Sequence, residues 1–241
     1  MLLPTSKTIK VFELKTMNCL IFGKPKIGKT QFASTMGDDV LFLATEDGHK
    51  HVEVFKVDIT KWEQLQELAK ELYNDAKTGK PKFKMLVVDT VDILYRLCRK
   101  FVCDKYDVDH QTDLAYGKGS DLVKDEMFRV LNAFNKMGYG ICFISHHQER
   151  EEKTKTSSWT ITDTSLPSAI SKLICGMSDF IFYIYIDENG ERWALTKPTK
   201  YIVAGDRTGK LPEKLKLDFK EIQTLLNKPD NKGEANGKLP R

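Results

Sequence analysis

The chain has 241 residues, of which 41% are hydrophobic and 30% are charged, which is ordinary for a soluble protein with one sizeable core. Its 38 basic and 34 acidic residues leave a net charge of +4, so the charge permits a nucleic-acid partner without indicating one. No apolar run approaches the roughly 18 residues of a membrane span and the N-terminus lacks a signal-peptide pattern, so we expect a cytoplasmic protein.

In chain order, the first expected element is a buried strand at 17–22, a short and mostly apolar run. The next segment fits G-x-x-x-x-G-K-[ST], the phosphate-binding P-loop. Its residues are Gly23, Lys24, Pro25, Lys26, Ile27, Gly28, Lys29 and Thr30, and Gln31 begins a helix expected at 31–36. Glycines let the backbone turn around an anion, and the loop N–H groups point at the phosphates. The strand and the helix favour an ATP site over a surface loop without a ligand.

Two residues of the P-loop have expected roles of their own. Lys29 would reach the β- and γ-phosphates of ATP, and the Thr30 hydroxyl would hold Mg²⁺. We therefore expect ATP and Mg²⁺ as the cofactors of this site.

The rest of the chain alternates between apolar strands and amphipathic helices. We expect strands at 40–44, 85–88 and 141–144, helices at 60–78, 91–105 and 120–137, a short helix at 169–176, and a hairpin from strands 180–186 and 192–196. The polar segment 148–165 has no apolar period and predicts a mobile loop. This order predicts an α/β fold with three layers, in which helices cover both faces of a mostly parallel sheet that ends in a C-terminal β-hairpin. We expect one domain over 1–227 and a disordered tail over 228–241.

The five cysteines are an odd number and include no C-x-x-C pair. Most of them lie in apolar segments, so we expect reduced core thiols and neither a disulfide framework nor a zinc site. They are Cys19, Cys98, Cys103, Cys142 and Cys175.

Polar residues follow three of the expected strands at the edge where the P-loop lies. Glu46, Asp89 and His146 all fall at this carboxyl edge of the parallel sheet, where ligands bind in open α/β sheets. Asp89 directly follows an apolar strand, as a Walker B aspartate does, and would hold Mg²⁺ together with Thr30. The alternative is an aspartate that caps the next helix.

The catalytic base needs a separate assignment, because Thr90 stands where some ATPases place a glutamate. Glu46 is the candidate that would orient a water toward the γ-phosphate, and the alternative is a solvated loop carboxylate. Asp92 competes for this role, although its place at a helix start favours an interaction with the helix dipole. His146 would either donate a hydrogen bond to the γ-phosphate or be bonded to backbone, and His147 is a weaker candidate for the same sensor role.

The P-loop, Glu46, the run Leu86–Thr90 and the run Phe143–His146 follow the order of the RecA-like ATPase core. More narrowly, residues 15–220 resemble the phage RecA-core ATPases grouped with single-strand annealing proteins. The resemblance implies a strand between the P-loop strand and the Walker B strand, and ATP bound between adjacent subunits of a ring or filament. It also implies that Glu46 activates water. RecA itself usually has a glutamine in the place of His146, so the histidine is a departure.

The resemblance further implies two loops that bind single-stranded DNA, at about 107–119 and 148–165. The candidate DNA-binding residues are Tyr116, Lys118, Lys153, Lys155 and Trp159. Basic side chains neutralise phosphates, and an aromatic ring stacks on a base for about 1–3 kcal/mol. Three glutamates in the second loop, Glu149, Glu151 and Glu152, leave open that it is a solvated segment of mixed charge.

Three cations in the C-terminal hairpin region, Lys197, Lys200 and Arg207, are candidates for a finger that reaches a neighbouring subunit's γ-phosphate. The alternative for each of them is an ordinary surface base.

The sequence thus favours a phage-encoded ATPase of the host cytoplasm that binds single-stranded DNA, forms homo-oligomers and promotes recombination by annealing, with a single-strand DNA-binding protein as a candidate partner. The alternatives are a nucleotide-gated assembly module with little hydrolysis and a motor of the helicase or helicase-loader type. A small-molecule kinase ranks lower, because no arginine-rich lid segment follows the Walker B region.

Overall fold

The computed structural model describes residues 12–153 and 157–228. Its centre is a sheet whose described strands number ten. They are β1 Cys19–Gly23, β2 Val40–Ala44, β3 Phe55–Asp58, β4 Met85–Asp89, β5 Gly140–Lys153, β6 Ser158–Thr164, β7 Phe180–Ile186, β8 Arg192–Leu195, β9 Gly205–Asp206 and β10 Lys214–Leu215. The strand order is β10-β8-β7-β1-β5-β4-β2-β3, with β6 paired to β5 and β9 paired to β7.

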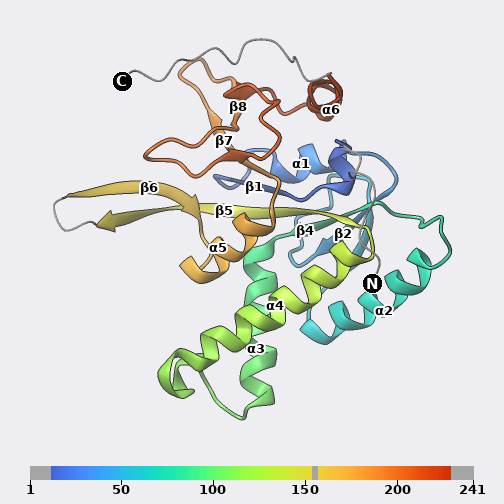
Figure 1. Ribbon diagram of the computed structural model, residues 1–241, viewed down its shortest axis with the longest axis vertical. Coiled ribbons are helices and arrows are strands. Elements are labelled where there is room, and N and C mark those ends of the chain that lie inside the picture. Colours follow the sequence, from blue (N-terminus) through green and yellow to red (C-terminus); the bar gives the residue numbers. More distant parts are fainter. Residues whose placement is uncertain (1–11, 154–156, 229–241) are drawn as a thin grey trace, which may run out of the picture.

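Helices cover both faces of this sheet (Figure 1). The α-helices are α1 Lys29–Ser34, α2 Trp62–Ala76, α3 Val91–Lys105, α4 Lys118–Lys136, α5 Ser168–Met177 and α6 Phe219–Asn227. Three short 3₁₀ helices lie at Leu14–Thr16, Gln111–Asp113 and Ala115–Gly117. The apolar side chains of α2 to α5 pack on one face, and those of α1 and α6 pack on the other. The described residues thus form the mixed α/β architecture that the sequence predicts.

The six strands from β3 to β7 in the sheet order pair in parallel, so their carboxyl ends share one edge. β5 lies between β1 and β4, which places one strand between the P-loop strand and the strand that ends at Asp89. β7 and β8 pair antiparallel, with Ile186 opposite Arg192. The edge that carries the end of β1 therefore also carries the ends of β2, β4 and β7.

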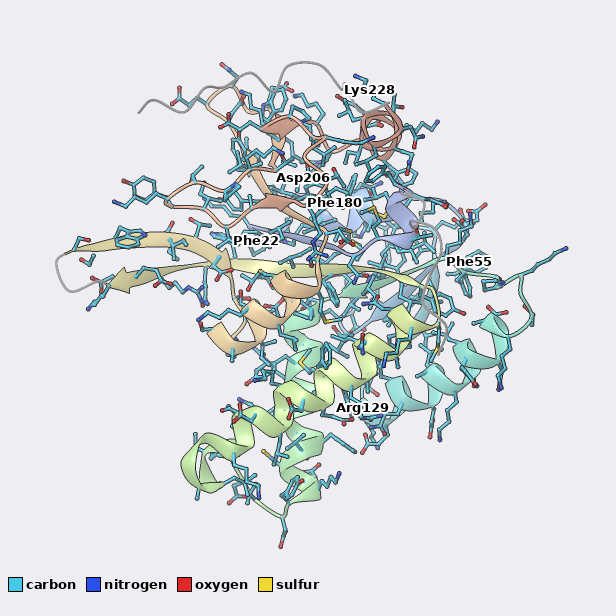
Figure 2. The ribbon with its side chains drawn as sticks, in the orientation of Figure 1. Phe22, Phe55, Arg129, Phe180, Asp206 and Lys228 are labelled. Carbon is cyan, nitrogen blue, oxygen red and sulfur yellow. The ribbon has the colours of Figure 1, made fainter. Side chains whose placement is uncertain are left out.

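Burial on both faces explains why the central strands read as continuous apolar runs. Every residue of β1, β2 and β4 is buried, because helices cover each side of the sheet. Two apolar cores result, one on each side: Phe22 belongs to the core under α2 to α5, and Phe180 belongs to the core under α1 and α6 (Figure 2). The packed helices hold the central strands in place, so the polar residues that follow these strands lie together at the carboxyl edge of the sheet.

The segment 148–165, expected to be a mobile loop, consists in its described residues mainly of two paired strands, so that prediction is wrong there. The end of β5 pairs antiparallel with β6, and Glu149 lies opposite Thr162 while Glu152 lies opposite Trp159. We call residues 147–153 and 158–164 the β5–β6 arm; it extends away from the sheet in Figure 1. Threonine, isoleucine and tryptophan on β6 favour the strand. The segment around Tyr201 also stabilises β6, because the backbone N–H of Thr162 donates to the carbonyl of Tyr201 at 2.7 Å.

Other departures from the sequence prediction are local. β3 and α6 were not expected, and α4 begins at Lys118, two residues before the expected start. All five cysteines are free thiols, of which Cys175 is half-buried and the others are buried. The expected tail over 228–241 lies, apart from Lys228, outside the described residues. No helix in the described ranges is both long and apolar enough to cross a bilayer.

Gly140→Ala is expected to lower the free energy of unfolding by about 1–3 kcal/mol. An added Cβ would lie 2.3 Å from the carbonyl oxygen of Lys15 and 2.7 Å from that of Met17, and backbone atoms cannot move aside as a flexible side chain can. Chemical denaturation measures the loss. Gly176→Ala is the matched control, because an added Cβ in α5 meets nothing within 4 Å and alanine favours a helix. Equal losses in the two variants would contradict the steric argument.

Candidate functional site

The P-loop leaves β1 at Gly23 and enters α1 at Lys29. Its backbone takes left-handed conformations at Lys26, where φ is 61°, and at Gly28, where φ is 99°. A Cβ on Gly23 would lie 2.5 Å from the carbonyl oxygen of Ile184, so the close approach of β1 to β7 requires glycine there. The loop therefore has the tight curvature that its glycines predict.

The Lys29 side chain is buried inside the curve of the loop. Its Nζ donates to the carbonyl oxygens of Gly23 at 3.0 Å and Lys24 at 2.9 Å. Burial lowers the pKa of Lys29 below its ordinary value, while nearby carboxylates, of which Asp89 acts most strongly, oppose that shift. A phosphate anion placed in the loop would stabilise this partly desolvated ammonium group.

Thr30 and Asp89 meet across the site. The Thr30 Oγ1 donates to Asp89 Oδ2 at 2.7 Å, and Asp89 is 5% exposed. A hydroxyl oxygen and a carboxylate oxygen side by side are the ligand types that Mg²⁺ accepts, so the residues present fit this ion. The structure brings together the two side chains expected to hold the metal.

His49 completes this corner of the site, and the sequence did not single it out. Its Nε2 lies 3.1 Å from Asp89 Oδ2 and its Nδ1 lies 3.2 Å from the carbonyl oxygen of Glu46. The hydrogen bond to Asp89 raises the pKa of His49 above its ordinary value, while burial acts in the opposite direction. The ring thus holds the Asp89 carboxylate toward Thr30. No motif predicts this contact, because the segment after β2 reads only as a polar turn.

Glu46 is tied to the end of β4 by two threonines. The Thr90 Oγ1 donates to Glu46 Oε1 at 2.8 Å, and the Thr90 backbone N–H donates to Thr45 Oγ1 at 2.8 Å. The Thr45 Oγ1 in turn donates to the Thr90 carbonyl at 3.0 Å. The peptide bond between Asp89 and Thr90 is cis. Glu46 itself is 41% exposed in its side chain, so one carboxylate oxygen is fixed while the group faces open space.

His146 lies on β5 next to Glu46, with 3.9 Å between its Nε2 and Glu46 Oε1. Its Nδ1 is buried and has no hydrogen-bond partner among the described residues. The alternative of a ring bonded to backbone is thus not what the structure shows. The neighbouring His147 points its ring at Tyr183, with 6.5 Å between the ring centroids, and is not part of this cluster.

Asp92, the competing base, is buried and already engaged. Its carboxylate accepts hydrogen bonds from Ser145 Oγ at 3.1 Å, from the His146 backbone N–H at 3.3 Å and from the Ser165 hydroxyl. These contacts hold both ends of the β5–β6 arm against α3. Asp92 therefore acts as a structural tie, and Glu46 remains the exposed carboxylate of the site.

These side chains line one cavity of about 430 Å³. Its lining includes Lys29, Thr30, Glu46, His49, Asp89, Thr90 and His146. A second cavity of about 640 Å³ lies against Lys24–Ile27 of the P-loop, between β7 and the segment that contains Ile202. The residues that the sequence assigns to Mg²⁺ and catalysis, and most of those assigned to ATP, therefore line the first cavity.

The expected DNA-binding and finger residues lie elsewhere. Lys118 begins α4, at the end of the α3–α4 pair that points away from the sheet in Figure 1. Lys153 and Trp159 belong to the β5–β6 arm. Lys155 and the side chain of Tyr116 lie outside the described part of the chain.

The three finger candidates all have contacts within their own chain. Lys197 forms an ion pair with Asp206 at 3.1 Å, and Arg207 forms one with Asp179 at 2.7 Å. The Lys200 Nζ lies 5.0 Å from the ring centroid of Trp159.

Comparisons with known proteins point to one family. A family model described as "AAA domain" matches residues 15–208. Among curated proteins, the chain is 30% identical over 133 residues to the "SPbeta prophage-derived uncharacterized protein YorG" of Bacillus subtilis (strain 168). That alignment covers 54% of this chain and 40% of the relative, so the chain spans well under half of the relative's length.

Proposed function

The chain belongs to the AAA domain family, and from this membership and the site geometry we propose that it couples ATP hydrolysis to the binding of single-stranded DNA. The family is one of P-loop ATPases, so nucleotide binding is the common property from which the proposal starts. The finer roles below rest on the contacts of this chain.

The phosphates of ATP would occupy the P-loop, where the Lys29 ammonium replaces part of its lost hydration with a bound anion. Thr30 and Asp89 would hold Mg²⁺, which would supply positive charge to offset that of the phosphates. His49 keeps the Asp89 carboxylate in place for this contact. Each of these groups lines the same cavity.

Glu46 would orient and deprotonate the attacking water. One of its oxygens is held by the Thr90 hydroxyl, and the exposed carboxylate is free to accept a hydrogen bond from water. His146 would then sense the γ-phosphate, since its ring stands beside Glu46.

One observation carries the link to DNA: β5 is a single strand from Gly140 to Lys153. It passes through the core, presents His146 at the nucleotide cavity, and continues without a break into the β5–β6 arm. A change at His146 on loss of the γ-phosphate would therefore move the arm directly.

Trp159 of the arm and the adjoining residues Lys200 and Tyr201 present an aromatic and basic surface that suits a single strand. The Lys200 Nζ lies 5.0 Å from the ring centroid of Trp159 and 5.7 Å from that of Tyr201, and Tyr201 is 55% exposed. Aromatic faces stack on bases and a cation neutralises phosphate, whatever the base sequence. This contact supports a role of Lys200 in DNA binding in preference to a finger.

The RecA-like resemblance and the prophage-derived relative support a narrower role in phage DNA recombination by annealing. The position of β5 between β1 and β4 agrees with that resemblance. The proposal includes self-association with ATP between subunits, in the host cytoplasm. Light scattering with ATP, with ADP and without nucleotide tests the assembly, and assembly without hydrolysis would favour a nucleotide-gated module.

The decisive measurement is the ATPase rate with single-stranded DNA, with double-stranded DNA and without DNA. We expect single-stranded DNA to raise the rate and its binding to weaken steeply with salt. A rate indifferent to DNA, together with no salt-sensitive binding, would refute the proposal.

Trp159→Ala is expected to weaken single-stranded DNA binding by about 1–3 kcal/mol, because a stacking surface is lost. The ATPase rate without DNA should stay unchanged, since Trp159 is not among the residues that line the nucleotide cavity. Fluorescence anisotropy with a labelled oligonucleotide measures the affinity. Tyr73→Ala, which removes a 47% exposed aromatic from α2, is the control. Wild-type affinity in the Trp159 variant would remove the arm from the DNA-binding surface.

A further inference from the structure

Arg192 places its guanidinium group on the P-loop of its own chain. A Cβ added to Gly28 would lie 2.6 Å from Arg192 Nη1 and 2.9 Å from its Cζ. Gly28 directly precedes Lys29 and takes a left-handed conformation, so it belongs to the tightest part of the loop. A cation from the β7–β8 hairpin thus stands against the segment that the proposed function assigns to the phosphates.

The sheet register explains how Arg192 reaches this place. Gly23 at the end of β1 is paired with Ile184 of β7. Two residues further along β7, Ile186 is paired with Arg192, the first residue of β8. Arg192 therefore lies on β8, the strand next to β7 on the side away from β1. Along the strand direction it lies two residues past Gly23, at the carboxyl edge of the parallel strands.

Two of the three acidic residues of the hairpin turn, Asp187 and Glu191, are engaged by groups other than Arg192. Asp187 accepts hydrogen bonds from the Glu191 backbone N–H at 2.8 Å and from Trp193 Nε1 at 3.0 Å. The Glu191 carboxylate forms an ion pair with Lys216. Among the residues that the structure describes, no carboxylate forms an ion pair with Arg192, so its charge is left for an incoming anion.

We propose that Arg192 binds the phosphate chain of the nucleotide held by its own P-loop, a proposal that rests on the assignment of that loop to ATP. A guanidinium group stays charged and offers parallel donors that match phosphate oxygens. Two of the three cations expected to act on a neighbour, Lys197 and Arg207, are instead paired with Asp206 and Asp179. Arg192 supplies a positive charge at the loop without a second subunit.

The first test is nucleotide binding by the full chain without DNA, measured by titration of a fluorescent ATP analogue and the matching ADP analogue. Arg192→Ala should weaken binding on the order of 10- to 100-fold, as expected for a lost hydrogen bond to a charged group. Arg192→Lys should fall between wild type and the alanine variant, because lysine keeps the charge and loses the fork. Lys214→Ala, which removes an exposed cation from β10 of the same sheet, should bind as wild type does.

The second test separates action within the chain from action on a neighbour. Arg192→Ala protein is mixed with Lys29→Ala protein, and the ATPase rate is compared with the sum of the separate rates. Action on the same chain's nucleotide predicts only that sum. A restored rate would overturn the proposal, because it requires Arg192 of one chain to complete the site of another.

The outcomes also separate this proposal from the proposed function. Wild-type affinity in both Arg192 variants would remove Arg192 from the nucleotide site, and the DNA-coupled ATPase would stand. An equal loss of nucleotide affinity in the Lys214 variant would show that the loss reflects only the change in net charge, and it would also overturn the proposal. A loss confined to the Arg192 variants, in a protein whose hydrolysis ignores DNA, would support Arg192 and contradict the coupling to DNA.

Discussion

Lys29→Ala is expected to weaken ATP binding by about 2–5 kcal/mol, which is roughly 30- to 4,000-fold, and to abolish measurable hydrolysis. The Lys29 ammonium is buried inside the P-loop, where its present partners are the carbonyl oxygens of Gly23 and Lys24. Its burial lowers its pKa, so the group gains more from an anionic partner than an exposed lysine would. Isothermal titration calorimetry with ATP and a phosphate-release assay measure the two effects.

The matched control for this variant is Lys70→Ala, which removes an exposed lysine from α2. It should leave affinity and hydrolysis unchanged. ATP binding of wild-type strength in the Lys29 variant would contradict the placement of the phosphates in this loop, whatever the DNA-binding results are.

Glu46→Gln is expected to leave ATP binding nearly intact and to lower the hydrolysis rate by about 10²- to 10⁴-fold, the usual contribution of a general base. Glutamine keeps the size of the side chain and can still accept the hydrogen bond from the Thr90 hydroxyl. What is lost is the negative charge that takes the proton from water. Single-turnover kinetics with saturating ATP isolates this step.

Asp47→Asn is the control for Glu46, because it makes the same chemical change at the next exposed position along the chain. Its hydrolysis rate should equal that of wild type. If the Glu46 variant retained turnover, the base would have to be sought elsewhere, and the engaged carboxylate of Asp92 would need to be freed from Ser145 and Ser165.

The parts of the site that the sequence predicts are those encoded by local patterns. The P-loop glycines and the apolar runs of β1 and β4 follow from backbone geometry and two-sided burial, so the sequence alone predicts the positions of Lys29, Thr30 and Asp89. The parallel order of the strands then brought Glu46 and His146 to the same edge.

The residues that the sequence missed depend on contacts between distant segments. His49 meets Asp89 only because the turn after β2 folds back over the end of β4. Arg192 reaches Gly28 through the register of two strand pairs, and neither pairing has a motif. The β5–β6 arm was missed for the same reason, since its polar residues are ordered by pairing with each other and by the segment at Tyr201. Local composition carries no information on such pairings.

The three hydrogen bonds to Asp92 anchor the base of the arm at one point. They join Ser145 and His146, the two residues that precede the arm, and Ser165, the residue that follows it, to a single carboxylate on α3. β6 has 7 residues, so the arm reaches roughly 20 Å beyond that point at about 3.3 Å per residue. If the arm couples the nucleotide cavity to DNA as proposed, His146 lies at this tie and Trp159 lies on the arm beyond it, so a slight rotation of the arm about Asp92 would displace Trp159 further than His146.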